Sequence, residues 1–197
     1  MKKVICLEGG GESKQVDISC REGFRKLFEK CGFVKRMPRL FACGGRSSTF
    51  ENFKTALANA YPGDYVAMLI DSEDPITAPS AWGHLKQRDA WDKPANASDE
   101  QVLFMATCME TWIVADRQAL TSHYKNLKES ALPPLIDLEN RKRHDVQENL
   151  ILATRNCANA YAKGKRSFKI LGELTPETLT QHLPNFKRAV DILNRIL

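Results

Sequence analysis

Three short apolar runs in the first half of the chain predict buried β-strands. They cover Lys3–Leu7, Arg39–Cys43 and Tyr65–Ile70, and the third run is continuously apolar, as in a strand covered on both faces. Between the runs, Ile18–Cys31 and Phe50–Ala60 repeat apolar residues at helical spacing. Because strands alternate with helices, the pattern favours an α/β fold with a mainly parallel central sheet and helices on both faces.

The middle of the chain predicts a loop followed by helices. Residues Pro75–Ser98 contain several prolines and little periodicity, which indicates a long loop of the kind that often serves as a lid. Ser98 is a helix N-cap candidate, and the apolar residues within Val102–Ile113 predict a strongly buried helix after it. We expect Arg117–Ser130 to continue as helix.

The last third of the chain predicts helices alone. Asp145–Tyr161 has the apolar spacing of an amphipathic helix, and Pro176–Leu179 and Asn185–Leu197 predict short terminal helices. Helices this short do not bury a core by themselves. We therefore expect one domain overall, in which residues 1–130 form the α/β core and residues 131–197 form a helical C-terminal extension packed on it.

Acidic residues directly follow two of the predicted strands. Glu8 and Glu12 flank three glycines after the first strand, and Asp71 and Glu73 follow the third strand. Ligands of open α/β sheets bind outside the carboxyl ends of parallel strands, so Glu8, Asp71 and Glu73 should converge on one pocket there and act as catalytic residues. Carboxylate oxygens suit one or two Mg²⁺ or Mn²⁺ ions. The alternatives are a solvated acidic turn, and for Glu12 a cap on the first helix.

A further acid and two basic segments complete the candidate site. Glu110 lies in an apolar stretch, where a carboxylate needs a base, a backbone donor or a metal, so it joins the candidate metal ligands. Arg46 precedes a predicted helix start, and Lys163, Lys165 and Arg166 form a basic cluster. These four cations are the candidate phosphate-binding residues, and solvated surface turns are the alternative for each.

Composition narrows the setting only modestly. The 197 residues carry a net charge of +5, which permits an acidic partner such as nucleic acid without requiring one. The six cysteines show no metal-binding spacing, and neither His84 nor His144 belongs to a zinc motif. With no signal peptide or apolar run of membrane length, we expect a cytoplasmic protein without membrane contact. Trp82 and Trp91 either stack on bases or pack the proline-rich loop down.

The two acidic turns are similar to those of Toprim domains. The motifs Leu7-Glu8-Gly9 and Asp71-Ser72-Glu73 resemble the E-G turn and the D-x-D turn of topoisomerases, primases, RNase M5-like nucleases and OLD-family nucleases. The second motif is D-x-E, followed by Asp74, so either Glu73 or Asp74 would supply the second ligand. The resemblance implies a Toprim-like Rossmannoid fold and metal-dependent nuclease chemistry.

A broader resemblance covers nearly the whole chain. The segments 41–46, 105–116 and 161–168, with the motif M-E-x-W-x-x-A-D, resemble an uncharacterised bacterial Toprim-like family. Its members are often encoded beside ATPases in phage-defence or abortive-infection loci. The resemblance therefore implies a nucleic-acid substrate and an ATPase partner protein, which fits the absence of a Walker A sequence in this chain.

Two functions remain open at this stage. The first is a metal-dependent phosphodiesterase, a nuclease acting on DNA or RNA in a phage-defence system. The second is a non-catalytic, Toprim-like binding or regulatory module for an ATPase or nucleic acid. A homo-oligomer is compatible with both, and titration with Mn²⁺ separates them.

Overall fold

A four-stranded, all-parallel sheet forms the centre of the protein in the computed structural model, which describes residues 1–197. Helices cover both faces of this sheet, so the predicted α/β class is confirmed. The strands are β1 (Lys3–Leu7), β2 (Arg39–Ala42), β3 (Tyr65–Asp71) and β4 (Val102–Met105). The helices are α1 (Lys14–Phe28), α2 (Arg46–Ala58), α3 (Ala81–Asp89), α4 (Met109–Ala115), α5 (Arg117–His123), α6 (Arg143–Thr154), α7 (Lys165–Leu171), α8 (Pro176–His182) and α9 (Pro184–Ile196).

The strand order β2-β1-β3-β4 places a change of direction between β1 and β3. The chain leaves β1 through α1 to reach β2, then returns through α2 to β3 on the other side of β1, and continues through α3 to β4. A point where the strand order reverses opens a crevice at the carboxyl ends of the two strands, and such crevices bind ligands in open α/β sheets. The topology therefore marks the ends of β1 and β3 as the place to look for a site.

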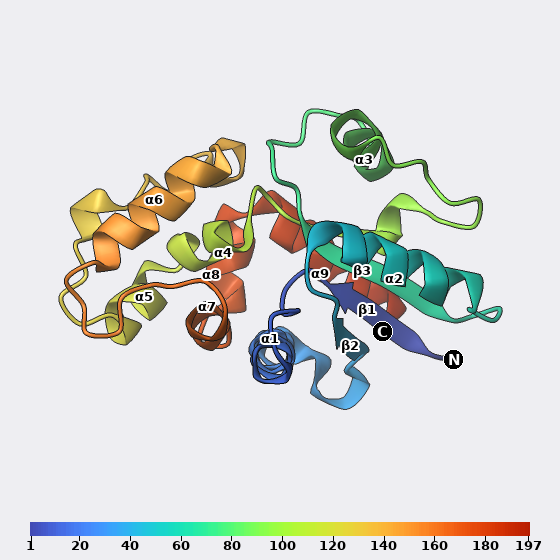
Figure 1. The fold of residues 1–197 in the computed structure, drawn as a ribbon, viewed down its shortest axis with the longest axis horizontal. Helices are drawn as coiled ribbons and strands as arrows, with labels where there is room; N and C mark the ends of the chain where they lie inside the picture. The colour runs from blue at the N-terminus through green and yellow to red at the C-terminus, as the bar shows by residue number, and fades with distance from the viewer.

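Alternating side chains of the strands bury two separate apolar clusters. Ile5 of β1 belongs to the larger cluster, which includes Phe24 of α1, whereas the next residue, Cys6, belongs to the smaller one with Phe53 of α2 and Trp82 of α3. This is the period of two expected for a strand. Figure 1 shows α1 and α2 on opposite sides of the sheet. Both faces are thereby covered, which explains why β3 and β4 are apolar at consecutive positions.

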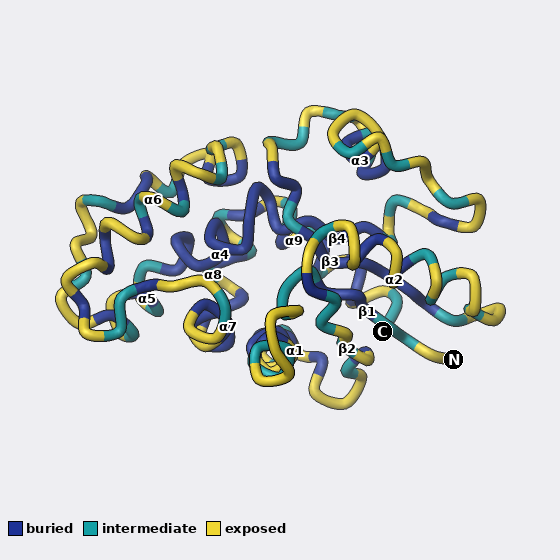
Figure 2. Tube along the Cα trace, in the orientation of Figure 1, coloured by how far each residue is buried: buried dark blue, intermediate teal, exposed yellow.

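The helices α4 to α8 form a lobe at the carboxyl edge of the sheet, and α9 returns from it to pack against β4 (Figure 1). The larger apolar cluster runs from the sheet into this lobe without interruption, as the buried segments in Figure 2 show. At its centre, the ring of Trp112 on α4 meets Phe186 on α9 edge to face at 4.9 Å. No helix of the protein combines the length and the apolar character needed to cross a bilayer.

The helix expected after Ser98 begins later in the structure than predicted. Residues Val102–Met105 were expected to begin a helix, but they form β4, which pairs with β3 in parallel register from Met68↔Val102 onward. A four-residue apolar run has no resolvable period, so it fits a buried strand and a buried helix equally well. The open edge of β3 decides the outcome, because its backbone groups need partners. The helical pattern belongs only to α4, from Met109 onward.

The expected loop over Pro75–Ser98 is also wrong in part, because it contains α3. Ser80 caps this helix by accepting the amide N–H of Gly83 at 3.0 Å, and Trp82 and Leu85 bury its inner face. The helix is too short for its apolar period to stand out among the prolines. Two helices end earlier than expected, α5 at His123 and α6 at Thr154, and α7 occupies a stretch for which the sequence predicts no helix.

Candidate functional site

Two glycine turns meet at the carboxyl ends of β1 and β2. Gly9 and Gly44 exchange backbone hydrogen bonds of 2.8 and 2.9 Å, which joins the turn after β1 to the turn after β2. Gly11 has φ +86°, and a Cβ atom at this position would lie 2.7 Å from the Cα of Gly44. Only glycine satisfies both the left-handed conformation and this close approach. The turns therefore hold Glu8 at a fixed place at the edge of the sheet.

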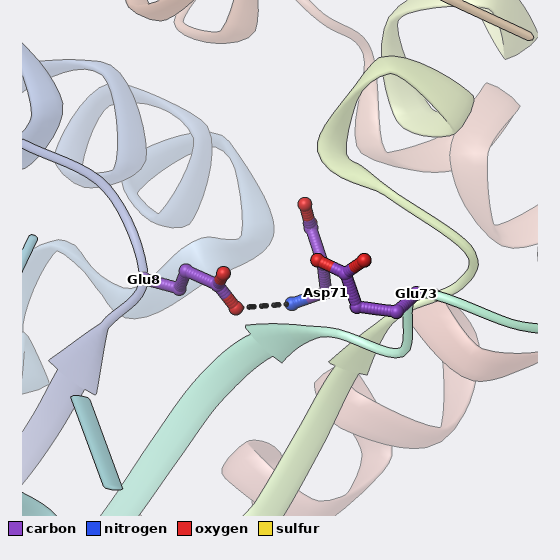
Figure 3. A group of neighbouring side chains, drawn as sticks. All are labelled: Glu8, Asp71 and Glu73. Carbon is purple, nitrogen blue, oxygen red and sulfur yellow. Dashed lines mark hydrogen bonds between the residues drawn. The ribbon is translucent and has the colours of Figure 1, made fainter. Parts of the chain in front are cut away.

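Glu8, Asp71 and Glu73 lie together at this edge, as Figure 3 shows. One carboxylate oxygen of each residue lies within 4.8 Å of the others. Glu8 leaves the end of β1, Asp71 is the last residue of β3, and the backbone N–H of Asp71 donates to Glu8 Oε2 at 3.0 Å. The sequence pattern predicts that these three acids converge on one pocket. The structure brings their carboxylates together at this edge, but only Glu8 and Asp71 line the cavity there.

Little positive charge lies near the carboxyl groups of Glu8 and Asp71. Burial raises the pKa of Glu8 to about 7, against the lowering effects of Arg46 and of the Asp71 N–H, and the charges of Glu73 and Asp89 add to the increase. The pKa of Asp71 is raised well above its ordinary value by burial and then by the charges of Glu8, Glu110 and Glu73. The pair therefore retains protons near neutral pH unless a cation replaces them.

Glu73 belongs to the same cluster but is paired with cations. It is buried, and its backbone adopts the left-handed region with φ 69°. Arg88 of α3 contacts its Oε2 at 3.2 Å, and Arg143, the first residue of α6, forms a second ion pair with the same oxygen. The two arginines, here called the Glu73 clamp, neutralise this carboxylate within the protein.

A cavity of 290 Å³ opens between the glycine turns and the helical lobe. Four acids line it, namely Glu8, Glu12, Asp71 and Glu110, and Lys163 is the one cation in its wall. Glu73 does not line this cavity. The wall therefore carries a clear excess of negative charge, which favours a bound cation.

Glu110 lies in the wall of the cavity and is buried. The hydroxyl of Tyr161 donates to its Oε1, and Gln147 Nε2 donates to its Oε2 at 3.2 Å. Burial and the neighbouring Glu110 raise the pKa of Tyr161 far above its ordinary value, so the hydroxyl stays a donor. Both carboxylate oxygens of Glu110 thus accept a hydrogen bond from the protein, and the charge of Glu110 still raises the pKa of Asp71.

Arg46 lies beside the acids but is already bound within the protein. Its guanidinium forms two hydrogen bonds to Asp89, of 2.9 and 2.7 Å, and a third to the backbone oxygen of Asp71. Glu8 Oε2 is 3.7 Å away, and the ring of Trp91 lies under the guanidinium at 5.1 Å. The structure therefore places Arg46, the first residue of α2, as a support for Glu8, held by Asp89 at the end of α3, and not in the cavity wall.

The predicted basic cluster divides between two places. Lys163 lines the acidic cavity, whereas Lys165 and Arg166 line a separate groove between α1 and α7. The two tryptophans of the proline-rich segment pack against the protein: Trp82 is buried, and Trp91 stacks on Phe50 at 4.1 Å.

Arg88, Asp89 and Arg143 are site neighbours that the sequence pattern does not reveal. Arg88 and Asp89 lie in the segment that was expected to be a loop, and Arg143 is separated from Glu73 by most of the helical lobe. The basic run Arg141–Arg143 was the only sequence signal for this contact.

The model of one protein family, described as a domain of unknown function (DUF4276), matches residues 7–194. The chain belongs to this family. The match starts at the end of β1 and stops inside α9, so it includes both acidic turns and the helical lobe. No curated protein and no solved structure matches the chain. The description of this family assigns no chemistry.

The donor set of the cluster consists of oxygen atoms alone. Such sets suit hard divalent cations, which take one or two carboxylates from a protein and complete their coordination with water or phosphate. Glu8 and Asp71 satisfy this requirement because they are adjacent, buried and short of positive charge. No cysteine or histidine belongs to the cluster. His84 lies near it, but its Nε2 contacts the backbone oxygen of Ser72 at 2.9 Å.

Proposed function

We propose that this protein is a metal-dependent phosphodiesterase whose cation is held by Glu8 and Asp71. The observation that carries the proposal is the uncompensated charge of this pair, at the point where the strand order reverses. Perturbed carboxyl pKa values in a cleft are typical of functional sites. Two arginines pair with Glu73, whereas the Glu8–Asp71 pair has one guanidinium nearby, that of Arg46 at 3.7 Å from Glu8, and Asp89 already pairs with it.

Mg²⁺ or Mn²⁺ fits the residues at the site. Glu8 and Asp71 would hold the ion, Glu12 lies in the same wall, and Glu73 would join only if the Glu73 clamp opened. Once bound, such an ion polarises a phosphoryl oxygen and makes a coordinated water more acidic.

The protein side chains offer two further functions. Glu8 Oε2 accepts the N–H of Asp71, so Oε1 is the free oxygen, which would serve either as a ligand of the ion or as a general base. Lys163 is exposed in the cavity wall, where it can contact a substrate phosphate. Arg46 holds the carboxylate of Glu8 in place from the side of α2.

Nuclease activity is the more specific form of this proposal. It is supported by the resemblance of the two acidic turns to Toprim nucleases. The broader resemblance of the chain to a bacterial Toprim-like family supports a role in phage defence with an ATPase partner, and a cytoplasmic setting fits both. DNA and RNA are both candidate substrates. Activity of the isolated chain should therefore be compared with activity in the presence of a candidate ATPase partner.

A non-catalytic binding module is the second candidate. One observation favours it: Glu73 and Arg46, two residues expected to act on the substrate, are both neutralised by ion pairs within the protein. Such a module would bind the ATPase or the nucleic acid through the same face without hydrolysing a phosphodiester.

A cleavage assay separates the two candidates. Wild-type protein, with and without the ATPase, should cleave DNA or RNA in Mg²⁺ or Mn²⁺ and lose activity in EDTA. Glu8→Gln and Asp71→Asn should each reduce the rate by about 100-fold or more, as expected when a general base or its partner is removed. Glu148→Gln, an exposed acid on α6 without an ion pair, is the matched control and should retain full activity. Cleavage that survives EDTA or the two site variants would sink the metal mechanism.

A further inference from the structure

The largest of the described cavities is a groove of 510 Å³ between α1 and α7. The two helices pack side by side, and Figure 1 shows them adjacent at the edge of the helical lobe. Their close approach depends on Gly23, because a Cβ atom there would lie 2.4 Å from the backbone oxygen of Phe168. The groove is thus a fixed feature of the packed helices, with the side chains of both helices forming its walls.

Four cations line this groove: Lys26 from α1 and Lys165, Arg166 and Lys169 from α7. All four are exposed, and none forms an ion pair. Glu22 is the one carboxylate in the lining. Like charges held along one groove repel each other, and a bound polyanion removes this repulsion.

The cations around the acidic site differ from those of the groove. Arg46, Arg88 and Arg143 surround the carboxylates, and each of them is paired with an acid of the protein. The groove cations have no such partners. Arg166 donates one hydrogen bond to the backbone oxygen of Ala160 at 3.1 Å, which leaves its charge without a carboxylate. Cations without an acid partner are the ones available to an external anion.

The groove and the acidic cavity are neighbours on the surface of the protein. Phe168 lines both of them, and the segment from Lys163 to Lys169 passes from the wall of the cavity into the wall of the groove. A chain of phosphates can therefore have one member in the acidic cavity and its neighbours over the groove. A free phosphate or a mononucleotide is too short to use both.

We propose that the α1–α7 groove binds the backbone of a single nucleic-acid strand that extends from the acidic cavity. This proposal rests on the proposed phosphodiesterase function of the cavity. The side chain of Glu8 is only 16 % exposed, so a phosphate reaches it only by entering the cavity between the glycine turns and α7. The rest of the strand would then continue along the groove. A flexible strand can follow this path, and grooves of positive charge are the common means of holding one.

Binding can be measured without the metal, which keeps this test separate from the test of catalysis. We would use Glu8→Gln protein in EDTA and follow the fluorescence anisotropy of labelled single-stranded DNA, single-stranded RNA, duplex DNA and a mononucleotide. Single strands should bind most tightly. The DNA and RNA arms identify which backbone the groove prefers. Equal or tighter binding of the duplex or the mononucleotide would overturn the proposal.

Charge reversal in the groove gives the decisive comparison. Lys26→Glu with Lys169→Glu should weaken strand binding by at least about tenfold, and the logarithmic salt dependence should become shallower by about 0.7 for each phosphate that the groove no longer neutralises. Lys35→Glu with Lys125→Glu makes the same charge change at exposed lysines outside the groove and should have a much smaller effect. Equal weakening in the two double variants would show that only net charge matters and would contradict a groove. Lys165→Glu is a second groove variant, and thermal unfolding checks that each protein is folded.

Discussion

Within one cluster of carboxylates, Glu73 is surrounded by cations, whereas Glu8 and Asp71 are surrounded mainly by other acids and by buried backbone. Arg88 and Arg143 reach Glu73 from α3 and α6 and neutralise it. The nearest cation to Glu8 is Arg46, whose guanidinium is already bound by Asp89. The difference separates two environments: Glu73 joins three parts of the chain through ion pairs, whereas the Glu8–Asp71 pair holds protons that a cation could replace.

The clamp should contribute most to stability. Arg88→Ala combined with Arg143→Ala leaves Glu73 buried without a counter-charge, and we expect a loss of about 3 kcal/mol in the free energy of unfolding, because removing one side of a buried ion pair is strongly destabilising. Chemical denaturation in EDTA measures this loss. Adding Glu73→Gln to the double variant should restore most of it. If the triple variant is no more stable than the double variant, Glu73 is not the partner that matters.

The Glu8–Asp71 pair should behave in the opposite way. The pKa of Glu8 is about 7 in the folded protein against 4.5 for an ordinary glutamate. Between these values the unfolded chain loses its proton while the folded chain keeps it, so the stability that Glu8 contributes is fully present below pH 4.5 and declines until about pH 7. Glu8→Gln removes this decline and should stabilise the metal-free protein at pH 8 by about 2 kcal/mol.

The measurement is the difference in unfolding free energy between Glu8→Gln and wild type across this pH range in EDTA. The difference should be near zero at pH 4.5, grow up to about pH 7 and then stay constant. Glu148→Gln should show no such trend, since this acid is exposed on α6. A Glu8→Gln protein that is less stable than wild type at pH 8 would contradict the description of Glu8 as an uncompensated charge.

The features that the sequence predicts depend on local pattern, whereas the features that it does not predict depend on contacts between distant segments. The parallel sheet and the meeting of Glu8 with Asp71 followed from local pattern, because two apolar strands each ended in acids and neighbouring parallel strands share one edge. Glu12 and Lys163 were named as candidates from local pattern as well, and both line the cavity.

The remaining features depend on contacts between distant segments. Residues Val102–Met105 became a strand because β3 offered an unpaired edge, which their own four-residue run does not reveal. Ion pairs join Arg46 to Asp89 and Glu73 to Arg143. The sequence alone gives no reason to bring these segments together. The sequence does not indicate the groove cations Lys26 and Lys169 for the same reason, because they come together only when α1 packs on α7.

Titration of Mn²⁺ by calorimetry tests the central claim most directly. We expect wild type and Glu148→Gln to bind Mn²⁺ at pH 7 and Glu8→Gln and Asp71→Asn to lose binding. Glu73→Gln should change the affinity much less, because the Glu73 clamp already neutralises that carboxylate. Binding should also release protons, to a larger extent at pH 6 than at pH 8, because the cation replaces protons held by Glu8 and Asp71. A wild-type protein that binds no Mn²⁺, or an Asp71→Asn protein that binds it as well as wild type, would contradict the account.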